Sequence, residues 1–204
     1  MKTVVVDGIR VAPSKVVCIG RNYVEHIKEL NNEMPSSMVL FMKPNSALSN
    51  ELTTRPQTTL HYEGEISFLI RKNNIYAVAF GLDLTDRALQ SELKGKGLPW
   101  DRAKAFNGAA VMSAFVSIDP FAIDQLTLKL WINDVLVQEG GVDLMIHKPL
   151  AVIEEINSFS TLIDNDILMS GTPKGVGSYQ KGDKFLGKIF VADKEIISKE
   201  WIAE

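Results

Sequence analysis

Short runs rich in β-branched and aromatic residues recur along most of the chain, and they restrict its fold more than any other feature. In order, they are TVVVDGIRVA, KVVCIG, EISFLI, IYAVAFGLDL, AFVSI, LTLKLWIND and KIFVAD, and several are bordered by Gly, Pro, Asn or Asp. Such runs are typical of strands that end in turns. The 204 residues, 46% of them hydrophobic, can supply one core, and no linker divides them. We therefore expect an α+β, predominantly β fold in a single domain over residues 1–204.

Three segments carry helical signals instead. In NYVEHIKELNN the apolar residues recur at i, i+4 and i+7, with Asn22 as the expected N-cap and Glu25 in the capping-box position. DRALQSELKG follows with Asp86 as a candidate cap and Gly95 at its end, and HKPLAVIEEINSFS places Pro149 where a first helical turn accepts it. The sequence thus predicts a few short helices between strands.

The charge balance and the single cysteine limit the partners and the compartment. Lys and Arg total 22 against 25 Asp and Glu, a formal charge of -3, so no overall positive field exists to hold a nucleic acid or an anionic membrane. Cys18 can form no internal disulfide, which fits a reducing compartment. No segment has the apolar length of a signal peptide or a membrane span. We expect a cytoplasmic protein with neither nucleic acid nor membrane as partner.

The run LHYEGEISFLI contains two acids where a buried strand is expected. Because side chains alternate along a strand, His61, Glu63 and Glu65 should share one face. Neighbouring carboxylates repel unless a cation such as Mg²⁺ lies between them. A half-exposed strand whose acids face water explains the same pattern. Asp83 adds a third acid in an apolar strand end, where an unpaired carboxylate is costly to bury.

His26 and Glu29 stand three residues apart on the first predicted helix and can be neighbours on its surface. A carboxylate beside an imidazole fixes its tautomer and raises its basicity, as a general base requires. A solvated histidine loosely paired with a surface acid is the alternative interpretation.

Two loops could contact an anionic ligand. SGTPKGVGS contains three glycines whose neighbouring amides could cradle an anion, although a plain tight turn explains it equally well. LKGKGLPWDRAKAFNG gathers Lys94, Lys96, Arg102 and Lys104, either for an anionic substrate or as a solvated basic loop.

Several separated motifs, in this order, resemble the fumarylacetoacetate hydrolase family, in particular its short acylpyruvase-like members. They include KVVCIGRNYVEHIKEL, VLFMKPNSAL, HYEGEI, LDLTDRALQ, KGLPWDRAKAFN, DLMIHKPLAVIEEIN and LMSGTPKGVG. The resemblance implies a mixed β-sandwich roll, a homodimer and an Mg²⁺ or Mn²⁺ site. The residues it implies are, for the metal, Glu63, Glu65 and Asp83; for catalysis, His26, Glu29 and Lys104; and for substrate binding, Arg21, Lys43, Gln90 and Thr172.

The activity implied by the resemblance is cleavage of a carbon-carbon bond in an acylpyruvate, such as fumarylpyruvate or acetylpyruvate, to pyruvate and a carboxylic acid. In that reaction the metal holds the 2-oxo acid end of the small substrate, while His26, supported by Glu29, activates water near Lys104. Similar proteins act instead as decarboxylases, isomerases or tautomerases on oxaloacetate or on an intermediate of homoprotocatechuate breakdown. A ligand-binding protein without turnover is a further alternative.

Overall fold

A computed structural model describes residues 1–204 as a mainly β protein. The strands are β1 (Val4–Val6), β2 (Ile9–Val11), β3 (Lys15–Gly20), β4 (Val39–Pro44), β5 (Leu48–Ser49), β6 (Leu60–Tyr62), β7 (Gly64–Arg71), β8 (Asn74–Asp83), β9 (Thr85–Asp86), β10 (Ala110–Met112), β11 (Val116–Ser117), β12 (Leu126–Ile132), β13 (Val135–Gly141), β14 (Ile167–Met169), β15 (Gly177–Ser178), β16 (Lys184–Val191) and β17 (Lys194–Ile202). The helices are α1 (Val24–Glu29), α2 (Arg87–Gly95), α3 (Asp101–Lys104) and α4 (Pro149–Phe159).

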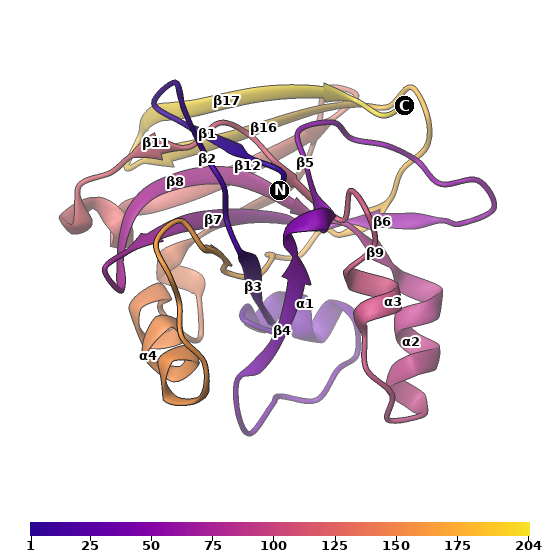
Figure 1. The fold of residues 1–204 in the computed structure, drawn as a ribbon. Helices are drawn as coiled ribbons and strands as arrows, with labels where there is room; N and C mark the ends of the chain where they lie inside the picture. Colours follow the sequence, from indigo (N-terminus) through magenta and orange to yellow (C-terminus); the bar gives the residue numbers. More distant parts are fainter.

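Two sheets form the body of the protein. The larger has the order β4-β3-β14-β7-β8-β10-β5, with β11 also paired to β8, and it is mixed because β14 runs parallel to β3 and β10 parallel to β5. The smaller is the antiparallel sheet β13-β12-β16-β17. Figure 1 shows β16 and β17 above β7 and β8, with the helices on the other side of the larger sheet. The predicted mixed β-sandwich is confirmed.

The main core lies between these sheets. Ile66, Phe68 and Phe80 of the larger sheet are fully buried in the same hydrophobic cluster as Leu128 of the smaller one. The sheets approach so closely that a Cβ on Gly187 of β16 would lie 2.7 Å from the Phe80 ring. Glycine is required there by contact between layers and not by a turn. The packed layers fix where the ends of β7 and β8 lie, and the site described below is built on those ends.

The helices confirm most of the sequence signals. Asp86 caps α2 by accepting a hydrogen bond from the backbone amide of Leu89 (3.1 Å), the helix ends at Gly95, and α4 begins at Pro149. The one-turn helix α3 was not predicted, because its four residues lie in a run that reads as a basic loop. None of these helices is long and apolar enough to cross a membrane.

The predicted capping of α1 is wrong. The helix begins at Val24 after Tyr23, and no side chain caps it. The carboxamide of Asn22 instead donates to the carbonyl oxygens of His147 (3.0 Å) and Ser170 (2.9 Å) and accepts from the amide of His147 (2.8 Å). It therefore joins three parts of the chain distant in sequence, and these tertiary hydrogen bonds replace the local cap.

Candidate active site

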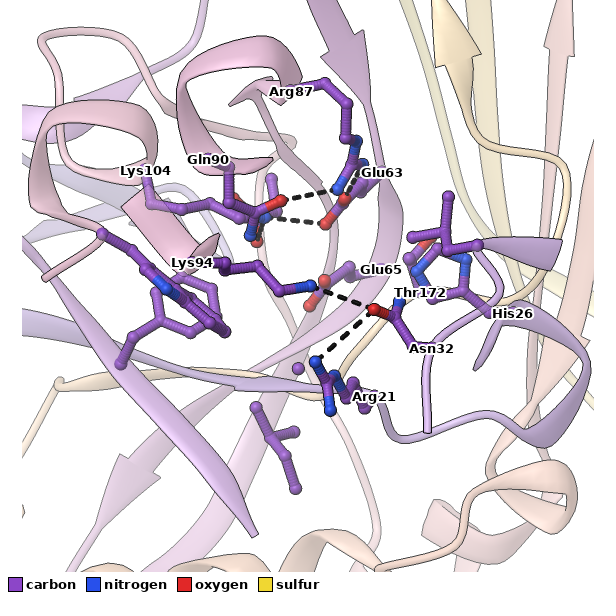
Figure 2. Close-up of a pocket in the computed structure, with 16 residues that line it drawn as sticks. Arg21, His26, Asn32, Glu63, Glu65, Arg87, Gln90, Lys94, Lys104 and Thr172 are labelled. Atoms are coloured by element: carbon purple, nitrogen blue, oxygen red, sulfur yellow. Dashed lines mark hydrogen bonds and ion pairs between the residues drawn. The ribbon is translucent and has the colours of Figure 1, made fainter. Parts of the chain in front are cut away.

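One small pocket, open to solvent, is lined by side chains from the end of β3, from α1 and the segment after it, from the adjoining ends of β7 and β8, and from α2 and α3. Figure 2 shows these side chains pointing toward a common space. The predicted site residues that line the pocket are Arg21, His26, Glu63, Glu65, Asp83, Gln90, Lys104 and Thr172. Glu29 and Lys43 lie outside its lining, and their contacts are described below.

The pairing of β7 with β8 brings the three acids together. Glu65 lies opposite Gly81, and the amide of Asp83 donates to the carbonyl oxygen of Glu63 (2.8 Å). One oxygen from each carboxylate lies within 4.8 Å of the others, and all three residues are buried. The interpretation of this run as a strand whose acids face water is therefore wrong. The acids are buried, and they line the pocket.

His61 does not join this cluster, although alternation along a continuous strand predicts that it shares the face of the acids. The strand breaks after Tyr62, and β6 pairs with β9 and β15 in a separate three-stranded sheet. His61 does not line the pocket. Burial, with repulsion from Arg87, lowers the pKa of its imidazole.

Two cations neutralise Glu63. The ammonium of Lys104 lies 2.8 Å from Oε2 of Glu63, and the Arg87 guanidinium pairs with Oε1 of the same carboxylate. Burial alone would raise the pKa of Glu63, but Lys104 and Arg87 outweigh burial and hold that pKa well below its usual range. Burial would likewise lower the pKa of Lys104, but Asp83 and Glu63 raise it. Lys104 therefore remains an ammonium and a hydrogen-bond donor.

Glu65 has no cationic partner. Its Oε2 accepts only the backbone amide of Gly171 (2.8 Å), and no Lys, Arg or His nitrogen forms a salt bridge with it. Burial, followed by repulsion from Asp83 and Glu63, raises the pKa of Glu65 well above its ordinary value. Oδ1 of Asp83 also accepts no hydrogen bond. A divalent cation bound by oxygen atoms would satisfy both groups, so these residues fit Mg²⁺ or Mn²⁺.

Lys43, predicted as a substrate contact, lies behind the acids. Its side chain is fully buried, and its Nζ donates to the carbonyl oxygens of Ala109 (3.0 Å) and Lys104. The same nitrogen lies 2.7 Å from Oδ1 of Asp83, in a direction that does not make a hydrogen bond. All of these contacts are with the protein itself. Lys43 is thus placed to position Asp83 and Lys104.

His26 and Glu29 contact each other on α1, and the backbone amide of Gly175 binds Glu29 from another segment. Nδ1 of His26 lies 3.1 Å from Oε2 of Glu29, and Oε1 of Glu29 accepts the amide of Gly175 (2.9 Å). His26 is 6% exposed, so it is not a solvated surface histidine. Gly175 has φ +98°, and a Cβ there would lie 1.9 Å from the carbonyl oxygen of Val137. Residue 175, whose amide binds Glu29, must therefore be glycine.

The glycine-rich loop binds carboxylates of the protein itself. Its amides at Gly171 and Gly175 donate to Glu65 and Glu29, so these two are not free for a ligand, as the anion-cradle interpretation would require. Thr172 donates to the carbonyl oxygen of Gly64 (2.9 Å), and its oxygen accepts the side-chain amide of Gln138 (2.8 Å).

Sequence reasoning missed several residues of the site. Gln138 of β13 also accepts the amide of Gly64 (2.8 Å) and so links the smaller sheet to the start of β7; no local pattern marks it. The four basic residues of the predicted loop have different positions. Lys94 and Lys104 line the pocket, whereas Lys96 and Arg102 are exposed. The only sequence feature that indicated Lys94 was its place in a run of several basic residues.

The comparisons with known proteins agree with this arrangement. The family model described as "Fumarylacetoacetate (FAA) hydrolase C-terminal" matches residues 15–198. This chain belongs to the fumarylacetoacetate hydrolase family. The family predicted from the separated motifs is thereby confirmed, and the pocket lies entirely within the matched region.

Two relatives in this family are described as oxaloacetate tautomerases. YcgM of Escherichia coli is 37% identical over 84% of this chain and 86% of its own length. A mitochondrial oxaloacetate tautomerase of Saccharomyces cerevisiae is 32% identical over 95% of this chain and 93% of its own length. Relatives of this family member are thus enzymes that act on a small 2-oxo acid.

Solved structures of the family have the same fold. A fumarylacetoacetate isomerase/hydrolase family protein from Oleispira antarctica superposes with a TM-score of 0.94 at 32% identity, over 100% of both chains. A fumarylpyruvate hydrolase from Pseudomonas aeruginosa, in complex with Mn²⁺ and pyruvate, gives 0.88 at 26% identity over 100% of this chain and 96% of its own. That neighbour therefore holds a metal ion and a 2-oxo acid.

Proposed function

We propose that this protein is a metal-dependent tautomerase that interconverts the keto and enol forms of oxaloacetate. The observation that carries the proposal is one pocket that brings the buried acids Glu63, Glu65 and Asp83 together with His26, whose imidazole is held by Glu29. The relatives support the substrate, because they are oxaloacetate tautomerases. They favour this activity over acylpyruvate hydrolysis, which the motifs put first.

In this proposal Glu63, Glu65 and Asp83 would hold Mg²⁺ or Mn²⁺. When bound, the ion supplies positive charge near the 2-oxo acid end of the substrate, which favours loss of a proton from C3. Lys104 donates hydrogen bonds in the same part of the pocket and stays protonated, so it stabilises developing negative charge and does not act as a base.

His26 is the proposed proton carrier. Because Glu29 accepts from Nδ1, the neutral imidazole keeps its lone pair on Nε2. In the keto form of oxaloacetate C3 carries two hydrogens, and in the enol form one of these protons is on the C2 oxygen. His26 would remove or return the proton at C3, while the oxygen exchanges its proton with water at the pocket mouth. One proton leaves carbon and one joins oxygen, so charge and atoms balance.

The decisive measurement follows the ultraviolet absorbance of the enol after oxaloacetate is added to the protein with Mg²⁺, Mn²⁺ or EDTA. We expect the metal-loaded protein to speed conversion well above the spontaneous rate with the same metal. Replacing His26 by Ala should slow it by about 100-fold or more. Lys28→Gln is the control, since Lys28 is exposed on the same helix and pairs only with Glu25. No acceleration with either metal would refute the proposal.

Acylpyruvate hydrolysis is a second candidate, which the His26–Glu29 contact favours because such a pair can also activate water. Incubation with acetylpyruvate, with separate detection of acetate, pyruvate and CO₂, tests it. Metal-dependent release of acetate and pyruvate would support hydrolysis. The His26→Ala variant should abolish it, whereas decarboxylation of oxaloacetate needs no attacking water and could survive the substitution.

The homodimer implied by the resemblance, the cytoplasmic location and the treatment of residues 1–204 as one catalytic domain stay predictions. Light scattering during gel filtration would measure the mass in solution. A mass twice 22.6 kDa is expected for the dimer, and a mass of one chain would contradict it.

A further inference from the structure

Two cationic side chains of the pocket donate hydrogen bonds to the same uncharged oxygen atom. Nζ of Lys94, on α2, lies 3.0 Å from Oδ1 of Asn32, and Nη2 of Arg21, at the end of β3, lies 3.4 Å from the same oxygen. Figure 2 shows the two side chains meeting at the Asn32 carboxamide. All three residues line the pocket that contains the buried acids.

Neither cation has an acidic partner. Lys104 and Arg87 pair with the carboxylates of the site, whereas no Asp or Glu carboxylate forms a salt bridge with Lys94 or Arg21. The other contact of Arg21 is a hydrogen bond from Nη1 to the backbone carbonyl oxygen of Glu33 (3.4 Å). Partial burial, followed by repulsion from Arg21 and Arg87, lowers the pKa of Lys94. An anion held between Lys94 and Arg21 would remove this repulsion.

The pocket therefore contains two regions of different charge. The three carboxylates suit a cation that would hold the 2-oxo acid end of a substrate. Lys94 and Arg21 form a region that suits a carboxylate, and Trp100 borders it, with its ring centre 5.8 Å from Nζ of Lys94. A ligand that fits both regions has a chelating end and a second negative group.

We propose that Lys94 and Arg21 bind the second carboxylate of a four-carbon dicarboxylic 2-oxo acid, and that Oδ1 of Asn32 stands where an oxygen of that carboxylate binds. This inference rests on the proposed function for its substrate class and adds the residues that select it. The incoming carboxylate takes the place of the carboxamide oxygen, because a charged acceptor binds two cationic donors more strongly than a neutral one. The protein thus discriminates against 2-oxo acids that lack a second carboxylate.

The placement of Asn32 gives the inference a specific consequence. An Asn32→Asp substitution would put a carboxylate of the protein between Lys94 and Arg21, where it competes with the ligand. Asn32→Ala would remove the carboxamide and leave both Lys94 and Arg21 in place. These two variants should therefore change the affinity for a dicarboxylate in different ways, although both remove the same carboxamide.

Titration calorimetry in saturating Mg²⁺ tests the inference without turnover. The probes are malate, a four-carbon dicarboxylate with a 2-hydroxyl group, and oxalate, which mimics only C1 and C2 of a 2-oxo acid. We expect Lys94→Gln and Asn32→Asp to weaken malate binding by about tenfold or more and to change oxalate binding less than about twofold. Asn32→Ala should bind malate at least as tightly as the unmodified protein. Lys96→Gln is the matched control, because Lys96 is exposed and pairs with Glu92.

Several results would overturn the inference. One is that Lys94→Gln leaves malate binding unchanged, and another is that it weakens malate and oxalate equally, which would mean a general effect on the pocket. Loss of malate binding in Asn32→Ala would show that the carboxamide itself is needed. If the unmodified protein binds both probes but does not convert oxaloacetate, only the proposed activity fails. If it binds neither, both the inference and the proposed 2-oxo acid site fail.

Discussion

The ammonium of Lys104 lies 2.7 Å from Oδ2 of Asp83, and the two side chains are 3% and 2% exposed. Burying such a pair costs hydration, and the attraction between the charges offsets that cost only while both partners are present. Lys104 also pairs with Glu63, so a single ammonium contacts two of the three acids. The stability of this region should therefore depend on Lys104 and on any cation that the acids bind.

Replacing Lys104 by Met should destabilise the metal-free protein by about 1.5–3 kcal/mol, because two buried carboxylates lose a shared hydrogen-bond donor while Arg87 and Lys43 remain beside them. Mn²⁺ should restore part of this loss, since it adds positive charge beside the same acids. Urea unfolding in EDTA and in Mn²⁺ measures both effects. Lys96→Met, at an exposed pair, should change the free energy of unfolding by less than about 0.5 kcal/mol. Equal stability of Lys104→Met and the unmodified protein in EDTA would contradict the prediction.

Glu65→Gln should have the opposite effect in metal-free protein. Glu65 has no cationic partner, and a Gln oxygen can still accept the amide of Gly171. Removing the charge should keep or raise the melting temperature in EDTA and should abolish most of the stabilisation that Mn²⁺ gives. Thermal melts with and without Mn²⁺ provide the comparison. A Glu65→Gln protein that Mn²⁺ still stabilises fully would show that Glu65 is not a metal ligand.

Gly175→Ala should reduce both stability and turnover. The new Cβ would clash with the carbonyl oxygen of Val137 at a φ of +98°, at a cost of about 1–3 kcal/mol, and the loop would move away from Glu29. Gly182→Ala is the matched control, since its φ is +92° but no atom lies within 4 Å of its Cβ. We expect turnover of oxaloacetate to fall only in the Gly175 variant. An equal fall in both would mean that backbone strain, and not the support of Glu29, is responsible.

The stability of the protein should depend on pH through Asp166, far from the acid cluster in sequence. Its buried carboxylate accepts the hydroxyl of Ser14 (2.6 Å), the ammonium of Lys15 (2.6 Å) and the amide of Ile163 (3.0 Å). Burial alone would raise the pKa of Asp166, but the hydrogen bonds from Lys15 and Ser14 outweigh it and lower that pKa. The carboxylate therefore stabilises the fold above its unfolded pKa of about 3.9, and this contribution is lost as pH falls through the lower, folded pKa.

Asp166→Asn should accordingly cost about 2–3 kcal/mol at neutral pH and less near pH 3. Urea unfolding of both proteins at the two pH values measures the difference, with Asp193→Asn, in an exposed turn, as the control. A cost that is the same at both pH values would show that shape and hydrogen bonding, and not charge, explain the role of Asp166.

Elements whose signals are local could be predicted from the sequence. Strand composition predicted β3, β7, β8, β12 and β16, and Asp86 and Pro149 marked the starts of α2 and α4, because alternation, capping and the fixed φ of proline act within a few residues. The spacing of Glu63 and Glu65 likewise predicted that their carboxylates point the same way.

Which residues meet at the pocket depends on contacts between segments distant in sequence. Asp83 joins the two glutamates through the register of β7 and β8, Gln138 reaches Gly64 from the other sheet, and Lys94 meets Arg21 at Asn32. Tertiary structure also overrode a local signal, since Asn22 bonds distant backbone groups and does not cap α1. These contacts depend on strand pairing and on packing between segments far apart in sequence, so no periodicity or spacing within one segment could predict them.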